Sequence, residues 1–268
     1  MDGTVRIEEL IPRVVELGQP AIALTDLANV FGLIKFYKAA RSAGVKPIAG
    51  SDVWVTNDED RDKPYRILLL VTSRVGYLTL CDLLTRAWLT NAHRGRGEIR
   101  REWLAHAPGL IVLSGARAGD VGPALMAGNT DMARALARQW QSWFPGAYYL
   151  ELQRTSAEAD QAYVHAALVL ASECALPVVA THPVQFLGSD EFRAHEARVC
   201  IAEGEILTNP RRARRFTADQ YLLSSEDMAA HFADVPSALA NTVAIAQRCN
   251  LTLNSASRSC PTFPPRRG

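Results

Sequence analysis

Short apolar runs alternate with longer amphipathic segments along most of this chain. Aliphatic runs flanked by polar residues predict strands, and apolar residues spaced three and four apart predict helices. The predicted strands cover residues 21–25, 47–50, 53–55, 67–71, 110–113, 148–152 and 178–180. The predicted helices cover residues 7–17, 33–43, 78–89, 132–143, 158–173, 191–201 and 236–249.

This alternation is typical of βα units around a mostly parallel sheet, so the chain is predicted to be an α/β protein. The run at 67–71 is apolar at every position, which indicates a strand buried on both faces. An open doubly wound sheet and a (β/α) barrel both fit the pattern. In either architecture, functional residues lie on the loops that follow the carboxyl ends of the strands.

Composition places the chain among ordinary globular proteins. Of its 268 residues, 48% are apolar and 21% are charged, which excludes disorder as the main state. No run reaches the roughly 18 apolar residues of a membrane helix, and the start has no signal-peptide pattern. The formal net charge of +1 does not predict a nucleic-acid partner, so such binding would need a local patch. Residues 1–253 are predicted to form one domain, and residues 254–268, rich in Ser, Pro and Arg, a linker or truncated tail.

The five cysteines form neither a zinc-finger pattern nor a CxxC pair. Cys174, Cys200 and Cys249 lie in helix-like apolar segments, where a buried thiol behaves as a small hydrophobic side chain. This context favours inert thiols over a redox or metal-binding role. It also indicates a reducing compartment, the cytoplasm.

Polar residues follow several of the predicted strands and are the candidates for chemistry. They are Thr25-Asp26, Ser51-Asp52, Ser114-Gly115, Glu151 and Thr181-His182. Carboxylates and imidazoles that converge at strand ends can hold a metal ion. Alternatively, Asp and Thr in these places cap the helices that follow. Glycine-rich phosphate loops, GxSxG and HExxH are absent, which excludes the enzyme classes that these motifs mark.

Two clusters of arginine are candidate phosphate-binding patches. The first is Arg94, Arg96, Arg100 and Arg101, and the second is Arg211, Arg212, Arg214 and Arg215. A solvated surface loop is the favoured interpretation of the first cluster, and for the second both interpretations stay open. Neither cluster has interleaved aromatic residues that would stack on bases.

A series of short motifs carries a resemblance to a known family. The motifs are IALTD at 22–26 with Asn29 and Gly32, KPI at 46–48 with Gly50, GLIVLSG at 109–115, YLEL at 149–152, LPVVAT at 176–181, NTV at 241–243 and RCN at 248–250. In this order they resemble the polymerase-and-histidinol-phosphatase (PHP) domain at the N-terminus of bacterial DNA polymerase III alpha subunits. The resemblance implies a distorted seven-stranded (β/α) TIM-like barrel. The family's first strand, with its His-x-His motif, would precede Asp2, so we expect a barrel open beside the strand that ends at Thr25.

In active members of the family, His, Asp, Glu and Cys side chains bind about three metal ions for phosphoester hydrolysis. Carried over position by position, the resemblance leaves three donors here, Asp26, Asp52 and His182. The substituted positions are Leu27, Arg66, Ala116, Arg154, Pro183 and Gln185. Arginine stays charged at any accessible pH, so we expect ion pairs of Arg66 and Arg154 with the two aspartates where metal would lie. No catalytic residue and no bound metal are therefore expected.

The resemblance implies a structural domain of a replicative polymerase that functions in DNA replication. Its implied partners are the thumb and palm of the same polymerase chain, the proofreading exonuclease subunit, and DNA through the parent enzyme, with no membrane. The palm would lie beyond Gly268, so this chain is expected to be a fragment that needs no cofactor, whereas the parent polymerase needs Mg²⁺. The alternative is an active metal-dependent phosphoesterase or 3′–5′ exonuclease, which would require a complete set of ligands.

Overall fold

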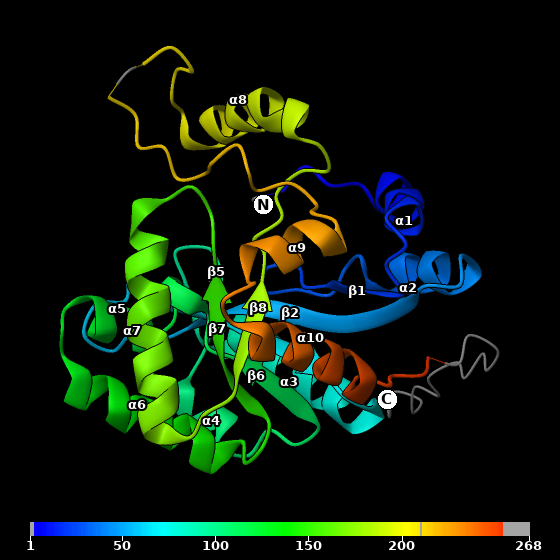
Figure 1. The fold of residues 1–268 in the computed structure, drawn as a ribbon. Coiled ribbons are helices and arrows are strands. Elements are labelled where there is room, and N and C mark those ends of the chain that lie inside the picture. Colours follow the sequence, from blue (N-terminus) through cyan, green and yellow to red (C-terminus); the bar gives the residue numbers. More distant parts are fainter. Residues whose placement is uncertain (1–2, 210, 254–268) are drawn as a thin grey trace, which may run out of the picture.

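A mixed sheet forms the centre of the protein (Figure 1). The structure is a computed structural model that describes residues 3–209 and 211–253. Its strands are β1 (Ala21–Leu24), β2 (Lys46–Val55), β3 (Tyr65–Val71), β4 (Ala92–His93), β5 (Arg96–Ile99), β6 (Leu110–Leu113), β7 (Tyr148–Gln153) and β8 (Val178–Thr181). Their order is β4-β5-β2-β3-β6-β7-β8, with β1 paired to the first half of β2.

The sheet is not parallel throughout, which corrects the predicted series of βα units. Strand β3 runs antiparallel to both of its neighbours, β2 and β6. Only residues 56–64 connect β2 to β3. That is too short for the helical crossover that a parallel pair requires, so the chain reverses direction. A second antiparallel pair, β4 with β5, forms a small hairpin that the apolar pattern did not predict.

The sheet does not close into a barrel. Among the described strands, β1 pairs only with β2, and β8 pairs only with β7. The outward carbonyls of β8 are taken instead by a helix, α10 (Pro236–Arg248). Asn241 Nδ2 donates to the carbonyl of Val178 at 2.8 Å, and Thr242 Oγ1 donates to that of Ala180 at 3.0 Å. Over the described residues the protein thus has an α/β fold with an open sheet of eight strands, and the predicted seven-stranded TIM-like barrel is not confirmed.

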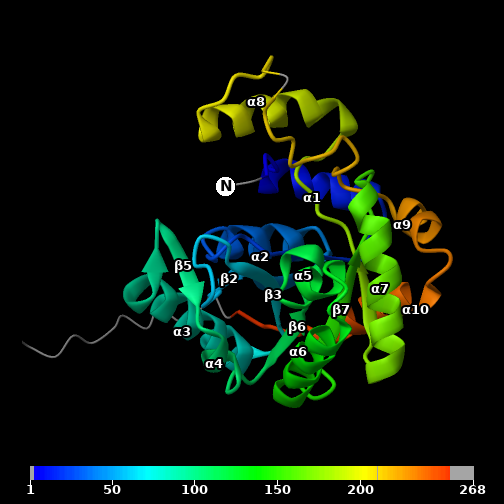
Figure 2. The ribbon, with the colours of Figure 1, turned by 90° about the vertical axis from the view of Figure 1, so that its left-hand side faces the viewer.

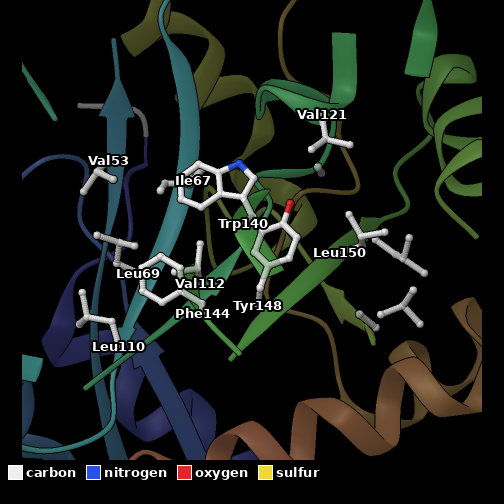
Figure 3. Packing of buried hydrophobic residues seen from close by; sticks show 14 of the residues in the cluster. Val53, Ile67, Leu69, Leu110, Val112, Val121, Trp140, Phe144, Tyr148 and Leu150 are labelled. Atoms are coloured by element: carbon white, nitrogen blue, oxygen red, sulfur yellow. The ribbon is translucent and has the colours of Figure 1, made fainter. Parts of the chain in front are cut away.

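Most helices pack on one face of the sheet, here called the outer face. The other helices are α1 (Ile7–Glu16), α2 (Leu33–Ser42), α3 (Arg74–Thr90), α4 (Arg101–Leu104), α5 (Val121–Met126), α6 (Thr130–Trp143), α7 (Glu158–Cys174), α8 (Phe192–Glu203) and α9 (Ser225–His231), with short 3-10 turns η1 (Ala116–Ala118) and η2 (Ser189–Glu191). Helices α1 to α7 supply most of the apolar core of this face. Figure 3 shows its centre, where Trp140 stacks on Tyr148 with ring centroids 5.9 Å apart.

Helix α10 covers the opposite face, here called the α10 face. Its Ile245 and Cys249 are buried against a second cluster that contains side chains from five strands. These side chains are Ile48, Leu70, Ile111, Leu113, Tyr149 and Val179. Lys46 Nζ fixes the end of the helix, because it donates to the carbonyl of Ala246 at 2.7 Å and to Asn250 Oδ1 at 2.8 Å. A cation is favourable at the carboxyl end of a helix.

The predicted helices agree with the observed ones to within a few residues, but several local features differ. The predicted strands at 47–50 and 53–55 form one continuous strand, β2. The first arginine cluster is not simply a solvated loop: Arg96 pairs with buried Glu98 at 3.5 Å, and Arg101 pairs with buried Asp120 at 3.0 Å.

Helix α8 and the segment after it lie at one end of the molecule, far from α4 and α6 at the other end (Figure 2).

The cysteines that the structure describes are not joined by disulfides. Cys174, Cys200 and Cys249 are buried and Cys81 is half-buried, as the apolar contexts predicted for the first three. The predicted tail at 254–268, which includes Cys260, lies outside the described residues. No helix within 3–209 and 211–253 is both long enough and apolar enough to cross a membrane.

The first testable prediction concerns the edge of β8. Replacing Asn241 by alanine removes the donor to the Val178 carbonyl, and we expect the free energy of unfolding to fall by about 1–2 kcal/mol. Urea denaturation measures this change. Val243→Ala on the same helix is the control, because Val243 is 59% exposed and its loss should change stability by less than about 0.5 kcal/mol. Equal losses in the two variants would contradict the proposed covering of this edge.

Candidate functional site

The α10 face is apolar toward α10 and polar toward the carboxyl ends of its parallel strands. Side chains alternate between the two faces of a strand. Asp52 and Trp54 of β2 therefore share the α10 face with Ile48, and Glu151 of β7 shares it with Tyr149. This polar end of the α10 face is the candidate site, and it matches the strand-end positions that the sequence indicated.

Arg66 and Asp52 form a bidentate ion pair at the centre of this site. Residue 66 lies opposite Trp54 in the register of β2 and β3, which makes Arg66 and Asp52 diagonal neighbours on one face. Arg66 Nε donates to Asp52 Oδ1 at 3.2 Å, and Nη2 donates to Oδ2. The Arg66 guanidinium also lies 5.1 Å from the centre of the Trp54 ring. The expectation of an internal ion pair therefore holds for Arg66 and Asp52.

Glu151 is a buried carboxylate beside this pair. Its side chain accepts hydrogen bonds from Thr181 Oγ1 at 2.5 Å, Gln153 Nε2 at 3.0 Å and the backbone N–H of Gly115 at 3.1 Å. Burial raises the pKa of Glu151, and the negative charge of Asp52 raises it further, although the three donors act in the opposite direction. The resemblance had left Glu151 out of the site. The pattern of polar residues after the predicted strands had identified Glu151 as a candidate independently of the resemblance.

The turn after β6 brings backbone into the site at close range. Gly115 has a φ of +76°, and a Cβ built there would lie 1.9 Å from the carbonyl oxygen of Arg66. Only glycine fits such a position. The next residue, Ala116, is also left-handed, with a φ of +48°, and it is buried. Ala116 occupies a position where the resemblance implies a ligand, and its methyl group cannot act as a metal donor.

Asp26 lies just after β1, near the start of α2. The backbone N–H of Gly32 donates to its carboxylate, but burial is the larger influence and raises its pKa. No ion pair of Asp26 exists among the residues that the structure describes. The neighbouring Leu27 forms a parallel bridge with Asp52 and contributes no polar side chain. Within residues 3–209 and 211–253, Asp26 is therefore a half-buried carboxylate without an ion-pair partner, which corrects the expectation of an ion pair there.

Arg154 does not pair with either aspartate of the site, which is the second correction. Its guanidinium binds both carboxylate oxygens of Asp234 at 2.6 and 2.7 Å and the carbonyl oxygen of His231. It also lies 5.0 Å from the centre of the Phe232 ring. The physical reason is the position of Arg154 directly after β7, at the start of the loop toward α7. From there its side chain reaches Asp234, which lies shortly after the end of α9 in sequence. Arg154 thus anchors the segment between α9 and α10.

The remaining predicted positions follow β8. His182 Nε2 lies 2.8 Å from the carbonyl oxygen of Asp219, and burial lowers the pKa of this imidazole. The carbonyl of Pro183 accepts from Gln220 Nε2 at 3.2 Å. The backbone carbonyl of Gln185 accepts from the N–H of Thr4 at 2.8 Å. These residues therefore hold neighbouring segments together.

The residues present do not fit a multinuclear metal centre. Within the described part of the chain, no three His, Cys, Asp or Glu side chains come close enough to hold one ion. Two of the remaining donors are already engaged, Asp52 by the Arg66 guanidinium and His182 by the Asp219 carbonyl. A cluster of cations would need more carboxylates and neutral imidazoles within a few ångströms. Asp52, Glu151 and His182 are thus each engaged by partners from the described chain, whereas Asp26 has no charged partner there.

The sequence matches a family model described as the PHP domain over residues 1–155. This chain belongs to the PHP family. It is 49% identical to a DNA polymerase III alpha subunit from Neisseria meningitidis serogroup A, over 98% of this chain and 23% of that protein. The alpha subunits of Pseudomonas aeruginosa and Escherichia coli K12 are 44% and 42% identical, over 100% and 98% of this chain and 23% of each relative. The PHP chain thus spans less than a quarter of these relatives.

An amidohydrolase from Chromobacterium violaceum aligns over 74% of this chain and 93% of its own length, with a TM-score of 0.49 and 16% sequence identity.

The second testable prediction concerns the pH dependence of stability. Because the folded-state pKa of Asp26 is raised, its ionisation opposes folding, and this penalty appears as the pH rises through the unfolded-state pKa of about 4. Asp26→Asn keeps an acceptor for the Gly32 N–H and removes the charge. In urea unfolding at each pH, we expect the variant to become progressively more stable than wild type as the pH rises from about 3.5 to about 7, the range over which the Asp26 carboxyl group ionises.

Asp58→Asn is the matched control, because Asp58 is exposed and carries the same formal charge. Its stability difference from wild type should stay nearly constant over that pH range. A loss of stability in Asp26→Asn that grows with pH would contradict this prediction, because it would mean that a cation stabilises the ionised Asp26 carboxylate.

Proposed function

We propose that this chain functions in DNA replication as the PHP domain of a DNA polymerase III alpha subunit, with a structural role and without metal-dependent catalysis. The replication role is supported by 42–49% identity to alpha subunits over nearly the whole chain. The structural role is supported by one observation above all, the Arg66 guanidinium on Asp52 at the centre of the candidate site.

The electrostatics of that ion pair argue against metal-dependent hydrolysis. Arg66 carries a permanent positive charge, which repels any cation that approaches Asp52. The side chains of both residues are half-buried, at 30% and 25% exposure, so water screens this repulsion only in part. Phosphoester hydrolysis by a metal centre requires an ion that polarises the phosphoryl oxygen and activates water. Neither task has a suitable group at this position.

The partners of such a domain follow from its place in the longer relatives. The matched region covers 23% of each alpha subunit, so the remainder of the polymerase chain is the first partner that we propose. The second is the proofreading exonuclease subunit, docked on the surface of this domain, and the third is DNA through the parent enzyme. The Mg²⁺ that polymerisation requires would belong to the rest of the parent chain.

The third testable prediction separates a structural domain from a hydrolase. Protein purified without chelators should contain well under one equivalent of metal by inductively coupled plasma mass spectrometry. It should not hydrolyse a generic phosphodiester when Zn²⁺ or Mn²⁺ is added, because Arg66 blocks the carboxylate that would bind the ion. Two or more bound ions per chain, or metal-dependent turnover that is lost in Asp26→Ala and His182→Ala, would overturn the proposal.

The docking role has a separate test in the parent polymerase. Deleting residues 1–253 from the full alpha subunit should abolish capture of the exonuclease subunit in a pull-down. Binding to the intact subunit should be insensitive to a chelator, since no metal organises the surface in this proposal. Retained capture after the deletion would refute the docking role and leave the metal-free role untouched.

A further inference from the structure

A cavity of about 160 Å³ lies beside the candidate site, between η1, the start of α7 and residues 215–220. This volume is about tenfold larger than the minimum that one water molecule needs. Arg117 and Arg215 are the lining residues with a positive charge, and Asp160 is the lining residue with a negative charge. The cavity is thus a polar pocket with an excess of positive charge.

Arg117 is held in a fixed position in this wall. Its Nε forms an ion pair with Asp160 Oδ1 at 2.7 Å. The other oxygen, Oδ2, accepts from the N–H and the hydroxyl of Thr155 at 3.0 and 2.5 Å, so this buried carboxylate is fully used. The two terminal amino groups of Arg117 make no hydrogen bond with the described residues, and the side chain is 43% exposed. Because the guanidinium is already held through Nε, binding a ligand through these amino groups would cost little additional side-chain entropy.

The segment 211–217, which carries the second arginine cluster, contributes Arg215 and Thr217 to the opposite wall. This segment carries four arginines and no acidic residue. Arg212 anchors it, because its nearly buried guanidinium binds Glu196 of α8. Phe216 is a second anchor, since its ring packs edge-on against buried His195 with centroids 4.8 Å apart. Arg212 is therefore engaged within the protein, unlike the exposed arginines of this segment.

The other three arginines of this segment point to solvent or to the cavity. Arg211 and Arg214 are exposed and have no acidic partner among the described residues. Arg215 is 69% exposed, and only its Nη1 approaches an acid, Glu203, at 3.3 Å. An exposed pair of this kind contributes little and exchanges readily for a stronger anion. The anchored segment thus places Arg215 in the cavity wall with Arg117, and it carries the exposed Arg211 and Arg214 on the stretch of chain just before Arg215.

We propose that this cavity and the segment 211–217 bind the phosphate groups of a single-stranded nucleic acid. Guanidinium groups pair with phosphate through two parallel hydrogen bonds. Arg117 and Arg215 would hold one phosphate in the cavity, and Arg214 and Arg211 would contact the phosphates that follow along the strand. The proposal rests on the proposed role in replication only for the source of the strand.

The contact should be independent of base sequence. The aromatic ring in the segment, Phe216, is turned inward against His195, so no exposed ring is offered for base stacking. Contacts to phosphate alone position a strand but do not distinguish its bases. We therefore expect oligonucleotides of different sequence to bind equally and with a strong dependence on salt.

The fourth testable prediction uses the 268-residue chain and a fluorescein-labelled 20-mer of deoxythymidylate in anisotropy titrations. The double variant Arg214→Gln/Arg215→Gln should bind about tenfold more weakly at 50 mM salt, and its salt slope should be smaller by roughly 1.4. Both side chains are exposed, so the fold should be retained, as thermal melting would verify. The double variant Arg41→Gln/Arg138→Gln removes the same charge from exposed positions on α2 and α6 and should leave the affinity unchanged.

Each other outcome decides against the proposal. Equal weakening in the two double variants would mean attraction by net charge alone, and no detectable binding by wild type would exclude the site. If inorganic phosphate raised the melting temperature through Arg215 while the 20-mer did not bind, the pocket would take a free phosphate and the proposed strand would be wrong. None of these results alters metal content or exonuclease capture, so failure here is distinct from failure of the structural role.

Discussion

The architecture depends on one constraint: a central sheet has two faces, and a single helix covers the apolar part of the second. Helices α1 to α7 cover the outer face, whereas Ile245 and Cys249 of α10 cover the other. The same helix satisfies the free carbonyls of β8 through Asn241 and Thr242. Unpaired strand edges otherwise recruit other chains. An open sheet is therefore stable here because α10 closes a face and an edge together.

The extent of α10 determines where the polar site can exist. Beyond the reach of the helix, the α10 face continues with Asp52, Arg66 and Glu151. Buried carboxylates need compensation by charge or hydrogen bonds. Arg66 provides the charge for Asp52, and Thr181, Gln153 and Gly115 provide donors for Glu151. Donors from the chain itself thus compensate Asp52 and Glu151 at this polar end.

The local pattern of apolar and polar residues predicted most of the strands and helices that could be predicted from the sequence. Apolar runs identified strands such as β6, and the alternation along β2 and β3 places Arg66 and Asp52 on one face. Partners distant in sequence could not be predicted in this way. Arg154 binds Asp234, which is 80 residues away. The antiparallel direction of β3 likewise depends on the length of one connection and not on the apolar pattern.

Because α10 is the last helix of the described chain, its position in sequence has a consequence for synthesis. Bacterial and eukaryotic ribosomes add about 5–20 residues per second, so β2 leaves the ribosome well before the helix that covers it. Lys46 and its hydrogen-bond partner Ala246 are 200 residues apart in sequence. Their hydrogen bond can form only after these residues have been synthesised. During that interval Ile48, Leu70 and Ile111 have no cover on their α10 face. The nascent chain is therefore most dependent on chaperones in the period before α10, Pro236–Arg248, emerges.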